Sequence, residues 1–132
     1  MIGCKKSINV SRIEKMLVEW LGDKVSERVF VGNTPPATLQ ESWTDFLLVD
    51  CDGIRDMDAY GTGTILLYTY VKPLNNNMKY GAKFIELEDK LTTLLSTTSL
   101  DNAMIRRRNT FNDYDDGIKW HFNVVELVLT IF

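Results

Sequence analysis

Apolar residues spaced three or four positions apart predict two helices in this chain. In the first helix, over residues 11–21, the apolar stripe is Ile13, Met16, Leu17, Trp20 and Leu21. Ser11 followed by Glu14 fits a capping box at its start, and Gly22 is a plausible stop. In the second helix, over residues 78–96, the stripe is Tyr80, Phe84, Leu87, Leu91, Leu94 and Leu95.

The remaining apolar positions predict five strands, over residues 28–31, 43–54, 61–71, 103–111 and 118–132. The second and third strands form a long hairpin with an acidic turn over residues 55–60. The continuous apolar run over residues 46–49 indicates that both faces of the sheet are covered there. Turn residues over 113–117 separate the last two strands, and the Asp-Gly pair there favours a hairpin.

The last strand changes the phase of its alternation. Residues Trp120, Phe122 and Val124 share one face, whereas Val125 and Leu127 carry the apolar pattern on the other. This change predicts a β-bulge near residues 123–125, or else apolar neighbours on both sides of the distal half.

The predicted order is α-β-β-β-α-β-β, which is typical of an α+β fold. We expect a mainly antiparallel sheet with long hairpins and both helices packed on one face. A chain of 132 residues suits one domain over residues 1–132, in which we expect residues 1–9 to form a flexible N-terminal segment.

Composition narrows the possible functions. Fifteen Lys and Arg against 18 Asp and Glu give a net charge of −3, which argues against a protein that depends on phosphate contacts. The sequence contains neither an apolar run of membrane-helix length nor the apolar core of a signal peptide, so we expect a cytoplasmic protein without a membrane partner. Cys4 and Cys51 lack ligand spacing and are expected to be free thiols.

Candidate catalytic and metal-binding residues are few. His121 is the only histidine, and no nucleophile accompanies it in a motif. The Asp-rich segments 50–53 and 113–117 lack the glycine and glutamate spacing of an EF-hand, and turn chemistry explains them better. Residues 61–63 lack the lysine of a phosphate-binding loop. We therefore predict no catalytic residue, no metal ligand and no cofactor.

Opposite charges gather in two parts of the chain. Acidic side chains dominate residues 41–58, whereas Arg106, Arg107 and Arg108 are consecutive. On a strand, Arg106 and Arg108 share one face and Arg107 takes the other, where burial would require a carboxylate partner. The charges form either two solvated surfaces or complementary patches for self-assembly.

The layout resembles the tail-terminator or tail-completion family of long-tailed phages and related neck proteins. The resemblance covers residues 10–132 and rests on the first helix, the turn Val-Phe-Val-Gly-Asn-Thr-Pro-Pro over residues 29–36, and the long hairpin. This turn is similar to the V-x-x-G-x-P-P type of the family but has one more residue before the prolines. It also includes Tyr80 and Gly81 at the start of the second helix and the segment 120–124 in the last hairpin.

The resemblance implies a structural protein and not an enzyme. Members of that family form a ring, commonly hexameric, which caps the tail tube, meets the head connector and lets DNA pass as cargo, so the chain would end in a virion or a phage-derived particle. The candidate subunit interface comprises Asp50, Asp52, Asp56, Asp58, Leu66, Tyr68, Tyr70, Arg106, Arg107 and Arg108. Of these, Leu66, Tyr68 and Tyr70 give the hairpin a second apolar face, which a lone protomer would expose. Two alternatives stay open. One is a ligand- or peptide-binding module with an apolar pocket under the helices, lined by Tyr68, Tyr70, Trp120 and Phe122, and the other is an enzyme using His121.

Overall fold

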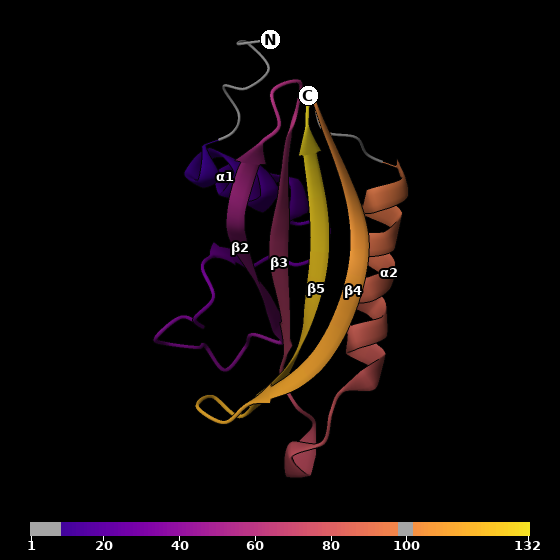
Figure 1. Cartoon of the computed structure of the whole chain (residues 1–132). Helices are drawn as coiled ribbons and strands as arrows, with labels where there is room; N and C mark the ends of the chain where they lie inside the picture. The colour runs from indigo at the N-terminus through magenta and orange to yellow at the C-terminus, as the bar shows by residue number, and fades with distance from the viewer. Residues whose placement is uncertain (1–8, 98–101) are drawn as a thin grey trace.

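The computed structural model describes residues 9–97 and 102–132 and has the predicted order of elements (Figure 1). Cys4 and all but the last residue of the expected flexible segment lie outside the described residues. The helices and strands are α1 Val10–Leu21, β1 Val29–Val31, β2 Asp45–Asp56, β3 Gly61–Val71, α2 Gly81–Thr97, β4 Ala103–Asp115 and β5 Trp120–Ile131, with a short 3-10 turn at Asn75–Asn77. The predicted α+β class is confirmed.

The strands form one five-stranded sheet in the order β1-β2-β3-β5-β4. Three of the four neighbouring pairs are antiparallel, and only the short β1 runs parallel to β2, opposite Leu47–Val49. The sheet is therefore mainly antiparallel, as predicted, and β2–β3 is the long hairpin.

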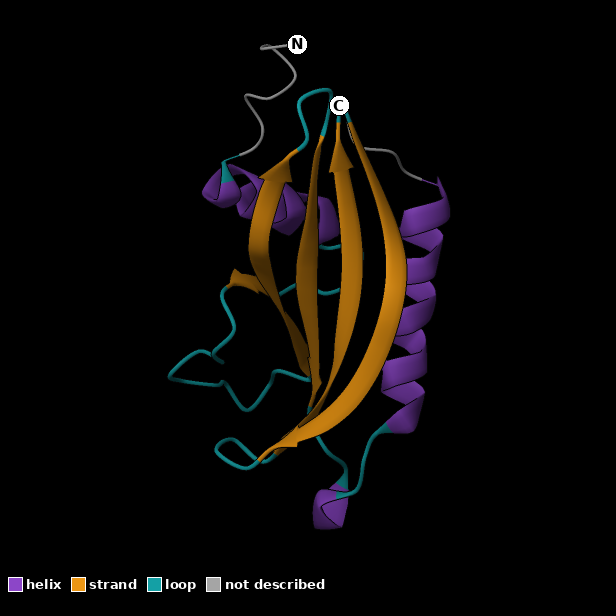
Figure 2. Ribbon diagram, viewed as in Figure 1, coloured by secondary structure: helices purple, strands orange, loops and turns teal. Residues whose placement is uncertain are grey.

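Both helices pack on the same face of the sheet, where they build the larger core (Figure 2). The predicted stripes supply it: Leu17 and Trp20 of α1 and Leu87 and Leu91 of α2 are buried. From the strands the core takes alternate residues, namely Leu47, Val49, Ile65, Leu67, Val71, Val125, Leu127, Leu129 and Ile131.

The start of α1 differs from the predicted capping box. Asn9 is the N-cap, and its side-chain oxygen accepts a hydrogen bond from the backbone N–H of Arg12 at 3.0 Å. Glu14 instead accepts from the backbone N–H of Cys51 at 3.1 Å and so ties α1 to β2. Ser11 already lies inside the helix and cannot cap it, whereas Gly22 ends the helix as predicted.

A smaller aromatic core lies on the other face of the sheet. Its buried members are Phe46, Leu48, Tyr70 and Trp120, and the loop over residues 32–44 supplies Leu39 and Trp43. Adjacent prolines and a lack of periodicity are typical of a loop that only crosses the surface, but this loop covers one end of the sheet. That cover explains the continuous apolar run over residues 46–49, because the larger core takes every second residue of the run and the smaller core the others.

The predicted β-bulge in β5 is wrong. β5 pairs with β3 without interruption, from Gly61 opposite Ile131 to Val71 opposite His121. The apolar pattern changes phase because the two cores cover opposite faces at opposite ends of the strand. The register shifts instead lie in β2, between Cys51 and Ile54, and in β4, between Arg107 and Thr110. β4 also runs on to Asp115, so that the turn before β5 is shorter than predicted.

Candidate functional site

The part of the sheet beyond the aromatic core, on the face away from the helices, carries half of the predicted interface residues. We call it the open face. It comprises Asp50 and Asp52 of β2, Thr64 and Leu66 of β3, Glu126 and Val128 of β5, and Arg106 and Arg108 of β4. Each of these side chains is exposed or half-buried, and their strand neighbours Cys51, Ile65 and Leu127 belong to the core under the helices.

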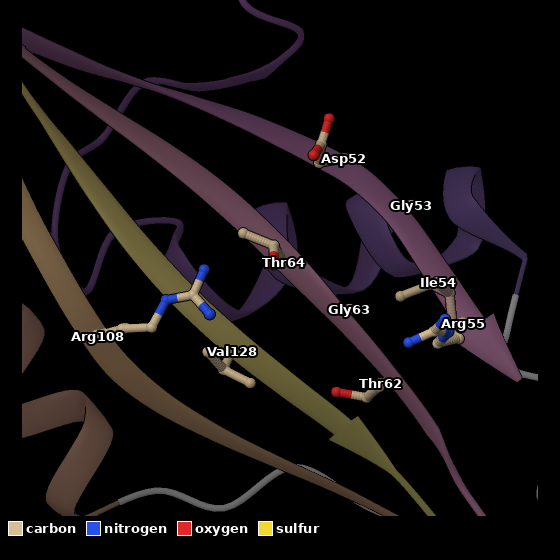
Figure 3. Close-up of a pocket in the computed structure, with 9 residues that line it drawn as sticks. All are labelled: Asp52, Gly53, Ile54, Arg55, Thr62, Gly63, Thr64, Arg108 and Val128. Carbon is tan, nitrogen blue, oxygen red and sulfur yellow. The ribbon is translucent and has the colours of Figure 1, made fainter. Parts of the chain in front are cut away.

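Strand pairing arranges the open face in rows that cross the sheet. One row runs from Asp50 through Leu66 to Glu126 and ends at Arg108. In the next row Thr64 pairs with Val128 and Val128 pairs with Arg106, while Asp52 lies beyond Thr64 on β2 (Figure 3). Each row has a carboxylate on β2 and a guanidinium on β4. We call Asp50 and Asp52 the acidic border, and Arg106 and Arg108 the basic border.

The bulge in β4 places both Arg108 and Asn109 opposite Glu126 on the open face. Arg108 Nη2 donates to Glu126 Oε2 at 3.0 Å, and Asn109 Nδ2 donates to Glu126 Oε1 at 2.9 Å. The hydrogen bonds from Asn109 and Arg108 hold the pKa of Glu126 below its ordinary value. In Figure 3 the Arg108 guanidinium reaches from β4 across β5. The side chain of Arg106 forms no hydrogen bond or ion pair with any described residue.

Arg107 points to the opposite face, as the alternation predicts. Its guanidinium lies 3.7 Å from the Glu88 carboxylate and 3.5 Å from the Thr92 hydroxyl, both on α2. Glu88 is thus the carboxylate partner that a covered Arg107 requires. Among the three consecutive arginines, the structure therefore turns Arg106 and Arg108 towards the open face and engages Arg107 within its own protomer.

The different surroundings of the arginines predict different effects of substitution. Replacing Arg107 with alanine should lower the free energy of unfolding by up to about 1 kcal/mol, because a partly exposed ion pair is lost. It should leave the solution molar mass unchanged. Arg106→Ala should leave the unfolding midpoint unchanged and weaken self-association. Urea unfolding and sedimentation velocity on both variants check this, and a reversed result would contradict the placement of the two side chains.

Of the three candidate apolar residues, Tyr70 is covered by its own chain. It is 3% exposed and stacks between the rings of Phe46 and Phe122, with both centroid distances 4.7 Å. The expectation that a lone protomer exposes Tyr70 is wrong, because the loop over residues 32–44 helps to build the aromatic core around it. Leu66 is half-buried on the open face, whereas the half-buried Tyr68 packs against the aromatic core.

The burial of Tyr70 has a consequence for stability at high pH. Burial and the nearby Asp115, whose carboxylate accepts a hydrogen bond from the phenol at 3.3 Å, raise the pKa of Tyr70 above its ordinary value. The unfolded chain therefore loses this proton first, and stability falls as the pH rises above about 10. In urea unfolding at about pH 9 and about pH 11, Tyr70→Phe should lose less stability than the wild type. An equal loss would contradict this environment.

The end of the β2–β3 hairpin holds the two remaining acidic candidates. Asp56 is the last residue of β2, and its carboxylate accepts a hydrogen bond from the backbone N–H of Asp58 at 2.9 Å in the turn. These two residues shape the turn, whereas Asp50 and Asp52 lie on the open face. A shallow hollow beside Asp52 is lined by Gly53 and Gly63 and opens next to Thr62 and Thr64 (Figure 3).

The residues considered for other chemistry are dispersed. His121 Nε2 lies 3.1 Å from the carbonyl oxygen of Asn77, and its ring lies against Tyr114. Cys51 is buried, and burial raises its thiol pKa. Within residues 9–97 and 102–132, no three His, Cys, Asp or Glu side chains gather in a way that could hold a metal ion. No helix in that part of the chain has the length and apolarity to cross a membrane.

The aromatic residues expected under the helices lie on the other face. Tyr68 and Phe122 have ring centroids 6.2 Å apart, and Trp120 lies 5.3 Å from Phe46. Their rings pack against one another and fill the smaller core. Buried apolar side chains from both helices and the sheet occupy the space where the ligand-binding alternative expects a pocket.

Sequence reasoning missed two exposed apolar residues beside the basic border. Met104 and Phe111 are each 55% exposed. Simple alternation with Arg106 would have placed Met104 on this face. It would have placed Phe111 on the helix side with Arg107, but the register shift in β4 moves Phe111 opposite Val124, on the open side.

Comparisons with known proteins add no family assignment to this geometry. A scan against protein-family models finds no matching family. A search of curated proteins finds no matching relative. The case for a function therefore rests on the open face and its charges.

Proposed function

We propose that this protein is a structural, self-assembling component of a phage or prophage tail, which forms a ring that caps the tail tube and joins it to the head connector. The observation that carries the proposal is the open face, where carboxylates on one border and guanidinium groups on the other lie at opposite sides of the same sheet. Surfaces with opposite charges at opposite sides suit head-to-tail contact between identical copies.

The composition of the basic border supports a protein contact at this place. Arg106 and Arg108 lie between the exposed Met104 and Phe111, and Met, Arg and Phe are enriched in protein interfaces. Half-buried Leu66 and Val128 lie between the two borders. Apolar side chains rimmed by charge are typical of a surface that a partner covers.

The charge balance fits a ring through which DNA passes without being held. The chain has a net charge of −3, and Arg108 is already engaged by Glu126. A conduit should not grip phosphates, because each neutralised phosphate adds affinity. DNA is thus proposed as passing cargo, and the lasting partners as further copies of the chain, the tail tube and the head connector.

Electron microscopy of the purified chain tests the proposed role. We expect closed rings with a central opening wide enough for duplex DNA, and binding of those rings to the end of a tail tube from the same phage or prophage. Open filaments, or rings that do not bind to tube ends, would contradict the proposed role. A matched preparation of the tube protein alone, which should keep elongating, is the control.

A further inference from the structure

We infer that neighbouring copies meet head-to-tail, with the acidic border of one copy against the basic border of the next, so that Asp52 faces Arg106 and Asp50 faces Arg108 of the neighbour. This inference rests on the proposed assembly role and names its contact. Another copy of this chain therefore binds at each border of the open face.

Three of the four charged residues of the two borders have no ion pair within the described residues. Asp52 and Arg106 are exposed, and neither forms an ion pair with a described residue of its own protomer. Asp50 also forms no ion pair within that part of the chain. Arg108 is bound to Glu126 of its own protomer and has further guanidinium N–H groups to donate. An exposed ion pair adds little affinity, but charges such as these select the partner and fix its register. The exposed Met104 and Phe111 supply apolar area beside those charges.

Both borders lie at edges of the sheet that another copy can reach. β1 pairs only with Leu47–Val49, so the half of β2 that starts at Asp50 has no described strand on its outer side. β4 is the opposite edge strand. Within the sheet β2 and β4 run in opposite directions, so copies placed side by side bring them together antiparallel. Side chains on the same face of antiparallel neighbours interact directly.

Two features indicate that side chains make this contact and not a continuous backbone ladder. Glu14 already accepts the hydrogen bond of the Cys51 N–H on the edge of β2. The register shift after Arg107 interrupts β4. Both features blunt an edge against uncontrolled strand addition, and arginines on the edge do the same. The charged side chains of the two borders then determine where along the edge a neighbouring copy binds.

The rows across the sheet determine how neighbouring copies are offset, which decides whether they form a ring or a filament. Asp50 and Arg108 end the same row across the sheet, and Arg106 ends the row that passes through Thr64 towards Asp52. Copies that match these rows lie side by side without sliding along the strands. A head-to-tail contact without such a rise closes into a ring where the rotation between successive copies completes a full turn, whereas one with a rise gives a helical filament.

Charge exchange across the proposed contact tests the inference. Asp52→Arg should place like charges opposite Arg106 of the neighbour, and Arg106→Asp should do the same opposite Asp52. Each variant alone should associate about tenfold more weakly or worse, because like charges suppress wrong partners. An equimolar mixture should recover the wild-type molar mass, because every contact in it again joins opposite charges. Light scattering gives both readouts.

Matched controls separate this contact from a general effect of charge. Lys15→Asp on α1 and Asp89→Arg on α2 make the same changes at exposed positions away from the open face, and should assemble as the wild type does. Asp52→Asn and Arg106→Gln, which remove charge without reversing it, should weaken association less than the reversals. Circular dichroism confirms that each variant is folded.

The outcomes distinguish this inference from the proposed role. Wild-type rings with unchanged assembly of both reversed variants would overturn the contact and leave the assembly role standing. Two weakened variants whose mixture stays weak would also overturn the pairing. A wild-type chain that never associates would overturn the role itself, and the contact with it.

Discussion

Phe46→Ala is expected to lower the free energy of unfolding by about 3–5 kcal/mol, the range for removing a fully buried phenylalanine. Phe46 is 0% exposed, stacks on Tyr70 at 4.7 Å and contacts the ring of Trp120 at 5.3 Å. It thus lies at the centre of the aromatic core. Urea unfolding followed by tryptophan fluorescence measures the change.

Phe111→Ala is the matched control for this prediction. Phe111 is 55% exposed on β4, so the same truncation should change the unfolding free energy of the dissociated, dilute chain by less than about 0.5 kcal/mol. A loss below about 1 kcal/mol for Phe46→Ala would contradict the account of the loop over residues 32–44 as a cover, because Phe46 would then lie on a solvated face.

Gly63→Ala is expected to lower the free energy of unfolding by about 1–3 kcal/mol. A Cβ atom at Gly63 would overlap the backbone carbonyl oxygen of Gly53 and the side chain of Ile54, and a backbone atom cannot swing aside. Gly53 has φ +137° in the bulge of β2, a conformation that favours glycine. The two glycines therefore let β2 and β3 approach closely beside the acidic border.

Gly81→Ala supplies the control on helix α2, where a new Cβ meets nothing within 4 Å. This variant should be as stable as the wild type or slightly more stable, since alanine is the better helix former. Thermal unfolding of both variants compares them under one set of conditions. If Gly63→Ala were as stable as Gly81→Ala, the close approach at the bulge would be refuted.

The order of elements followed from the sequence because each element carries its own periodicity. The stripe containing Leu87 and Leu91 is helical, and the alternation over residues 61–71 matches β3. The loop over residues 32–44 has no periodicity, so its cover of Phe46 could not be predicted. The phase change in β5 was visible, but its cause is the position of the two cores, which only the folded chain reveals.

The site was predictable as far as strand alternation reaches. Alternation correctly separated Arg107 from Arg106 and Arg108, and it required a carboxylate for Arg107 without identifying Glu88. Pairing between distant strands brings Asp50 and Arg108 into one row, and no local pattern encodes that juxtaposition. The bulge that turns Phe111 outwards left no signal in the sequence either.

The solution molar mass of the wild-type chain over a wide range of protein concentration tests self-assembly most directly. Size-exclusion chromatography with light scattering should find one discrete species of several copies, whose population grows with protein concentration. This species should dissociate in high salt, because salt screens exposed charges. A monomer at every concentration, with the open face still uncovered, would contradict the account.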